Sequence, residues 1–200
     1  MAQLKGKRIG VSEKDTGADA YVVQEWLTAL GLRLDRGDYT LLNTGGLANR
    51  VAALKAGGTE ATALVPPFDL QTIAAGFNDL GQSPEVVKHF QWAAFIAKAS
   101  WLKARSADAV AFSRAIVRAA KFLQDPSNKA RAIQHLVEAT GLKEDLATTL
   151  YGILIPLLTK DGSLDPEGLA PWAKYVKATP EDMKKLVDDT YLKQAQAAVR

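Results

Sequence analysis

Short apolar runs and helical stretches alternate over the first part of the chain. Residues 8–11 (RIGV) form an apolar run too short for a helix, which indicates a buried strand. Further strands are predicted over residues 39–43 and 60–65, and Pro66 stops the last one because proline cannot donate to a strand ladder. The helix after the first strand has four apolar side chains on one face, at positions i, i+3, i+4 and i+7: Val23, Trp26, Leu27 and Leu30.

The second predicted helix has Leu47, Val51 and Leu54 on its inner face. Three strands alternating with two helices predict parallel β-α-β units and a sheet covered on both faces. In such sheets ligands bind beyond the carboxyl ends of the strands. We also predict a short helix over residues 69–75 and a further strand over residues 90–97 (FQWAAFIA).

From about residue 106 the pattern changes to helices alone. We therefore predict an α/β lobe over residues 3–105, followed by an all-helical C-terminal region over residues 106–200. Three helix-end signals stand out: an N-cap at Asp165 before Pro166, a capping box of Thr179 and Asp182, and a C-terminal glycine at Gly141. The most apolar helix face is expected to bury against a substantial partner, and it carries Leu146, Leu150, Ile153, Leu154 and Leu157.

Composition narrows the class of protein. The chain is 48% hydrophobic and 24% charged, as soluble globular domains are, and no apolar run approaches the roughly 20 residues of a membrane span. The net charge is +3 and the basic residues are interspersed with acidic ones, so we expect no nucleic-acid partner. The charged start of the chain lacks the apolar segment of a secretion signal, which predicts either a cytosolic protein or one whose beginning has been cut away.

Signatures of catalysis and of cofactor binding are missing from the sequence. The absence of cysteine removes thiolate metal sites and cysteine nucleophiles, and neither His89 nor His135 has a second ligand at metal spacing. The chain contains no phosphate-loop motif and no G-x-S-x-G nucleophile turn. We therefore expect a protein that binds a ligand without catalysis, metal or cofactor.

The candidate binding site lies in three loops that follow the predicted strands, at one edge of the sheet. These loops and the helix starts beside them contain the candidate contacts, namely Ser12, Thr16, Gly17, Ala18, Thr44, Gly45, Gly46, Asn49, Arg50, Pro66, Pro67 and Phe68. Hydroxyls and free backbone N–H groups at helix starts bind anions, although the same residue types are more often plain N-caps. Arg50 is either a partner for a carboxylate or sulfonate or a solvated side chain. The Pro66–Phe68 rim suits a ligand with an organic body and an anionic head.

Five segments, taken in order along the chain, resemble one known family. They are residues 4–11 (LKGKRIGV), 45–54 (GGLANRVAAL), 63–69 (ALVPPFD), 161–169 (DGSLDPEGL) and 186–192 (LVDDTYL). The chain resembles the nitrate, sulfonate and taurine class of type II periplasmic binding proteins, which are the solute receptors of ABC importers.

That resemblance implies two α/β lobes joined by a hinge, a ligand cleft between them and a membrane permease as partner. It also implies a periplasmic location and a small anionic solute. The Ser12–Ala18 loop and the Gly45–Arg50 helix start would form one wall of the cleft, and Pro66–Phe68 would lie near the hinge. Because the family has about a hundred residues before its Leu-Lys-Gly-Lys segment, this chain resembles the second lobe with its C-terminal helices. If the first lobe is absent in nature, the apolar Leu146–Leu157 face is expected to bury in a homodimer.

Two alternatives stay open at this point. The same lobe serves in cytosolic regulators as a ligand sensor or interaction domain without transport. The scaffold also includes a thiamine-pyrimidine synthase branch, but the cysteine-rich motif of that enzyme cannot exist in a chain without cysteine.

Overall fold

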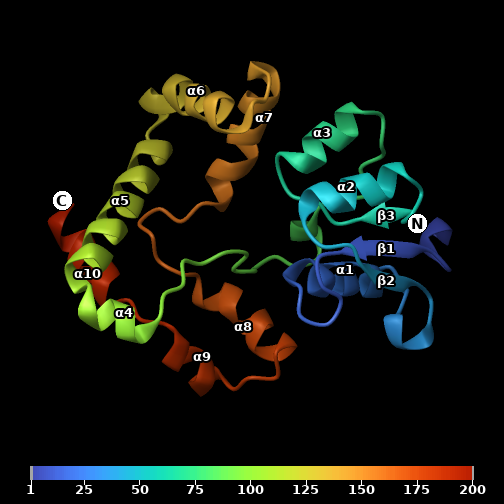
Figure 1. The fold of residues 1–200 in the computed structure, drawn as a ribbon, viewed down its shortest axis with the longest axis horizontal. Helices are drawn as coiled ribbons and strands as arrows, with labels where there is room; N and C mark the ends of the chain where they lie inside the picture. The colour runs from blue at the N-terminus through green and yellow to red at the C-terminus, as the bar shows by residue number, and fades with distance from the viewer. Residues whose placement is uncertain (1, 200) are drawn as a thin grey trace. The chain divides into compact units, whose positions relative to one another are not determined.

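The computed structural model describes residues 2–199, apart from the side chains of Ala2 and Pro180. The chain divides into two units, Met1–Phe90 and Gln91–Arg200, which are described one at a time (Figure 1). The domain boundary that the sequence predicts after residue 105 stays a prediction.

The first unit is built on a three-stranded parallel sheet, as the sequence predicts. Strand β1 (Arg8–Val11) is central and pairs with β2 (Thr40–Asn43) on one side and β3 (Ala61–Thr62) on the other. Ile9 lies opposite Leu41 and Ala61 in this register. The third strand is shorter than the predicted 60–65, because only Ala61 and Thr62 pair with β1.

Helices cover the two faces of this sheet (Figure 1). Helix α1 (Ala18–Ala29) packs on the face that carries Ile9, and the buried cluster there includes Val11, Leu27 and Leu41. Helix α2 (Leu47–Lys55) contacts β1 and β3, and α3 (Phe68–Ala74) packs against α2. Short 3₁₀ turns span Ala2–Leu4, Leu34–Arg36 and Ser83–Glu85. The prediction that Leu30 faces the sheet is wrong: α1 ends at Ala29, and Leu30 is 38% exposed.

An ion pair fastens the start of β1 to the residue before β3. The Arg8 guanidinium donates to Glu60 Oε1 at 2.7 Å, and the Arg8 backbone N–H donates to Glu60 Oε2 at 2.8 Å. The side-chain hydrogen bond from Arg8, followed by its backbone bond, lowers the pKa of Glu60 from 4.5 to about 2.

We therefore expect the Glu60 carboxyl, followed by NMR, to titrate at about 2. Arg8→Ala should raise this pKa toward 4.5, because the side-chain hydrogen bond that is the main cause of its depression is gone while the backbone hydrogen bond remains. The ionised Glu60 carboxylate contributes to the free energy of unfolding above pH 4.5, and this contribution is lost as the pH falls through about 2. A wild-type titration near 4.5 would contradict the ion pair.

The predicted strand over residues 90–97 does not form. The segment is held at its start, where the Gln91 N–H donates to Gly168 O at 2.9 Å and Trp172 Nε1 donates to Gln91 O at 2.8 Å. Beyond this tie it runs to residue 98 with no ladder partner among the described residues, so an apolar pattern alone does not make it a strand. Its side chains are open to solvent, with Phe95 74% and Ile96 94% exposed.

Helices make up the rest of the second unit. They are α4 (Ala99–Ala104), α5 (Ser106–Gln124), α6 (Lys129–Thr140), α7 (Glu144–Leu154), α8 (Pro166–Tyr175), α9 (Pro180–Leu186) and α10 (Thr190–Ala198), with 3₁₀ turns at Pro126–Asn128 and Ile155–Leu157. Helix α5 packs along α10, and α6 along α7 (Figure 1). The three helix-end signals are confirmed: Asp165 caps α8, Thr179 and Asp182 form a capping box, and Gly141 ends α6 with φ 68°.

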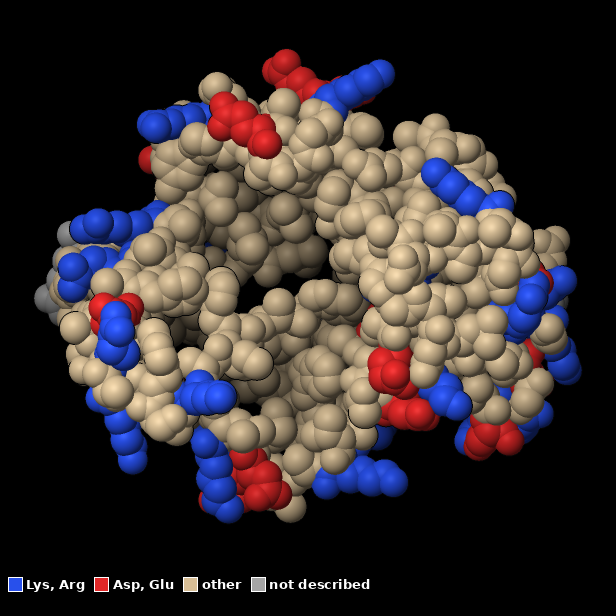
Figure 2. Space-filling view, viewed as in Figure 1, with Lys and Arg blue, Asp and Glu red and all other residues tan. Residues whose placement is uncertain are grey.

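The apolar face predicted in α7 is only partly covered within the second unit. Leu150 is buried, whereas Ile153 and Leu157 are 37% and 65% exposed. Association of two copies through this face stays a prediction. In the part of the chain that the structure describes, no helix has the length and hydrophobicity needed to cross a membrane. Figure 2 shows acidic and basic side chains interspersed over the face in view, without a stripe of one sign.

Candidate ligand site at the carboxyl edge of the sheet

The three strands are parallel, but the chain adds β2 on one side of β1 and β3 on the other, so the strand order reverses at β1. The chain leaves β1 through α1 to reach β2 on one side, then passes through α2 to β3 on the other side. The loops that follow β1 and β3 therefore lead away from neighbouring strands, one to a helix and the other to the Pro66–Pro67 turn. In open α/β sheets, the crevice between two such loops is the usual ligand position.

A buried ion pair lies at this edge of the sheet, between the loops that follow β1 and β3, and this position is called the crevice below. The guanidinium Nη1 of Arg50, on α2, donates to Asp19 Oδ2 of α1 at 2.5 Å, and to the Ala63 carbonyl after β3 at 2.7 Å. Asp19 is 4% exposed and Arg50 is 7% exposed. One side chain thus ties together two helices and the end of a strand. The pair carries no net charge, so Arg50 is neither solvated nor an unopposed cation for a ligand.

The loop after β1 also holds this carboxylate. The Ser12 backbone N–H donates to Asp19 Oδ2 at 2.7 Å, and the Ser12 hydroxyl donates to Asp19 Oδ1 at 2.5 Å. Asn43, at the end of β2, fixes the next turn of the loop by accepting from the Lys14 N–H at 2.7 Å and donating to Glu13 Oε1 at 3.0 Å. The loop over residues 12–17 is therefore set by side chains from two other elements.

Position 17 requires glycine because neighbouring atoms occupy the space that a Cβ would need. A Cβ there would lie 2.4 Å from the Glu13 carbonyl oxygen and 2.7 Å from both Asp19 Oδ1 and Ser12 Oγ. No real Cβ sits so near backbone, so any side chain would push the loop away from the carboxylate. Gly10 plays a similar part on the opposite face of the sheet, where a Cβ would lie 3.0 Å from the Thr44 hydroxyl.

The threonine hydroxyls near the crevice are already used as donors. Thr44 Oγ1 donates to the Val11 carbonyl at 3.1 Å, and Thr62 Oγ1 donates to the Gly10 carbonyl at 2.8 Å. These bonds hold the strand ends together and leave each hydroxyl able only to accept. Thr16 is exposed at the outer side of the loop.

The start of α2 is the open end at this edge. Gly45 has φ 75°, Gly46 is the N-cap, and Asn49 is exposed in the first turn. This turn carries no acidic residue and no side-chain cap, so its backbone N–H groups are available. The start of α1 differs, because Asp19 lies in its first turn.

The predicted rim is present beside this edge. Pro66 and Pro67 are joined by a cis peptide bond, and Phe68 begins α3; all three side chains are half-buried. Ala18 is half-buried at the start of α1, directly after the packed glycine. Within residues 2–199, no three His, Asp or Glu side chains gather in a way that would hold a metal ion.

Sequence reasoning missed the group that organises the crevice. Asp19 has the position of an ordinary first-turn acid, and nothing local marks it as the partner of Arg50, which lies 31 residues away. The available signal was a pair of opposite charges, each in the first turn or so of a helix that follows a strand. Parallel strands bring such positions to one edge, so the pairing follows once the strand order is known.

The family to which the chain is assigned indicates a periplasmic-binding-type solute-binding domain or a related domain. Residues 1–137 match the NMT1-like family, and the chain belongs to this family. A solved protein structure from Bordetella bronchiseptica RB50 has a similar fold, with a TM-score of 0.68 and 22% sequence identity. The similarity covers 98% of this chain but 66% of the solved chain, so this chain spans about two thirds of that protein's length. No curated protein matches the sequence.

Proposed function

We propose that this chain binds a small anionic or anion-headed organic solute, such as a sulfonate, nitrate or carboxylate, as the solute-binding component of an ABC importer. The observation that carries the proposal is the uncapped start of α2 at the carboxyl edge of the sheet. The dipole and the free N–H groups of a helix start favour a negative charge placed there.

The charges around the crevice favour α2 over α1 as the position of the anion. Asp19 already compensates the start of α1, and its pairing with Arg50 leaves the floor of the crevice neutral. An incoming anion therefore meets an acidic side chain near α1, but backbone donors and the Asn49 amide at α2. Phe68 and the two prolines offer apolar contact for the organic part of the solute.

Calorimetric titration with taurine, nitrate and acetate tests this assignment. Asn49→Asp puts a carboxylate in the first turn of α2, where it occupies the anion position and also stabilises the helix. We expect at least tenfold weaker binding of the anion that binds the wild type, with an unchanged or raised melting temperature. The loss of binding would then not come from unfolding.

Ala52→Asp is the matched control, because it adds the same charge to an exposed position of the same helix beyond the first turn. Its affinity should stay within about twofold of the wild type. Equal affinities in all three proteins would overturn the site, and no binding of any tested anion to the wild type would overturn the proposed solute class.

The transport role belongs to the same proposal. We propose a periplasmic location, a membrane permease as partner and no catalytic activity. Membership in the NMT1-like family supports the solute-binding theme, and the ion pair of Asp19 with Arg50, which leaves no free carboxylate there, supports binding rather than proton transfer.

A further inference from the structure

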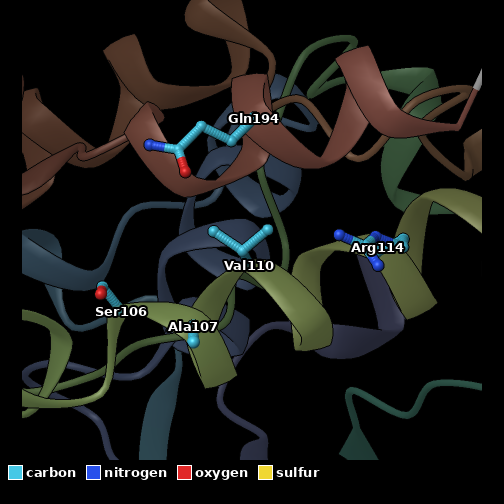
Figure 3. A pocket seen from close by; sticks show the side chains of 5 residues that line it. All are labelled: Ser106, Ala107, Val110, Arg114 and Gln194. Carbon is cyan, nitrogen blue, oxygen red and sulfur yellow. The ribbon is translucent and has the colours of Figure 1, made fainter.

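A polar cavity lies in the second unit, between α5 and α10. It is an open cavity of about 330 Å³. Its lining consists of Ser106, Ala107, Val110, Arg114 and Gln194. Four of these residues follow one another along a single face of α5, and Gln194 faces them from α10 (Figure 3). Pockets of this size sit at the small end of the range for ligand sites, about 300–1,000 Å³.

Arg114 has no partner in this cavity. Its Nε is buried and donates to no acceptor among the described residues, and its guanidinium forms no ion pair with them. A buried donor without a partner is costly, because it has lost its water and gained nothing in return. Because the Nε atom itself is closed off, an acceptor that enters the cavity pairs with the terminal guanidinium nitrogens of Arg114.

The charges of the lining residues determine which ligand charge the cavity favours. None of the five lining residues is acidic. The nearest carboxylates along α5 and before α10 already have cations of their own: Asp108 accepts from Arg105 at 2.5 Å, and Asp189 pairs with Lys193 at 2.7 Å. The cavity therefore holds one uncompensated positive charge.

The arrangement along the cavity indicates the shape of the ligand. Figure 3 shows Val110 between the guanidinium of Arg114 and the amide of Gln194. Ala107 and Val110 form an apolar floor, and the Ser106 hydroxyl lies at the end away from Arg114. A molecule that spans this floor meets a cation at one end and neutral hydrogen-bonding groups at the other.

We propose that this cavity binds a short aliphatic carboxylate, with the carboxyl group on the Arg114 guanidinium and the chain over Val110. A guanidinium binds a carboxylate through two parallel N–H bonds, and the two terminal nitrogens of Arg114 can supply both donors. The site is separate from the crevice of the first unit and does not depend on the function proposed for that crevice.

NMR of the arginine Nε–H groups in the full chain tests the proposal directly. Butyrate and glutarate are the probes, butyramide is the uncharged control, and sodium chloride keeps the ionic strength constant. We expect the Arg114 Nε–H signal, assigned by its loss in Arg114→Gln, to shift in a saturable manner with either acid and to stay in place with butyramide. A signal that does not move, or that moves equally with butyramide, would overturn the proposal.

Three variants separate this site from general effects. Arg118→Gln removes an exposed arginine one turn further along α5 and should leave binding unchanged. Gln194→Glu adds a carboxylate to the lining, which competes for Arg114, and should weaken binding at least tenfold without unfolding the chain. Asn49→Asp acts on the first unit and should leave the Arg114 shift intact. An Arg114 shift that saturates in Gln194→Glu at the same concentration of acid as in the wild type would refute the site.

Discussion

Replacing Asp19 with alanine is expected to reduce the free energy of unfolding by about 3–5 kcal/mol, the usual loss when one partner of a buried ion pair is removed. The structure explains why the loss falls at the upper end of single-residue effects. Arg50 would keep a 7% exposed guanidinium with a single carbonyl acceptor, and Ser12 would lose the acceptor of both its donors. Urea denaturation followed by circular dichroism measures the change.

A double variant separates the stranded charge from the loss of the pair itself. Replacing a buried pair with apolar residues of similar volume is often neutral or stabilising, so Asp19→Leu with Arg50→Met should recover much of the loss.

The comparison with an exposed pair supplies the control. Arg33 and Asp35 are joined by two hydrogen bonds on the surface, and Asp35→Ala should change stability little because water replaces its partner. An equally small effect of Asp19→Ala would contradict the burial of the pair.

Leu27→Ala is expected to destabilise the first unit by about 2–5 kcal/mol. Leu27 is fully buried in the cluster that α1 forms with the sheet, so truncation leaves a cavity beneath Ile9 and Leu41. Thermal and urea unfolding of the two proteins give the difference.

The matched control for this change is Leu30→Ala, three positions further along. Helical periodicity places both leucines on the inner face, but Leu30 lies beyond the last residue of α1 and is 38% exposed. The same truncation there should cost a fraction of the Leu27 value, because little apolar area is lost from the core. Equal effects at the two positions would mean that the helix continues as the periodicity predicts.

The parts of the fold that the sequence predicted correctly depend on few neighbouring residues. Asp165 caps α8 through a bond to the N–H two positions on, and Thr179 bonds to Asp182 within one turn. The three strands and the two helices between them follow from short apolar runs and helical periodicity. Such signals are local, so they do not require knowledge of the tertiary structure.

The errors arise where burial depends on a distant partner. The apolar run over residues 90–97 could form a strand only beside another strand, and the described residues offer none. Phe95 in this run is 74% exposed, and its ring meets that of Phe112 edge to face, with the ring centroids 4.9 Å apart. Around the candidate site, the ends of β1 and β2 and the starts of α1 and α2 follow from local signals, whereas the Asp19–Arg50 pair required the strand order.

Asp19 and Arg50 are buried, whereas Asn49 at the start of α2 is exposed, and this difference affects which positions can change in sequence. The groups that hold the crevice together face one another, and the groups that remain open to a solute, such as Asn49, take no part in that framework. Substitutions at the open positions can therefore accumulate without loss of the fold. For the proposed solute site, such a scaffold is evolvable, because its solute preference can change at the open positions while its architecture stays constant.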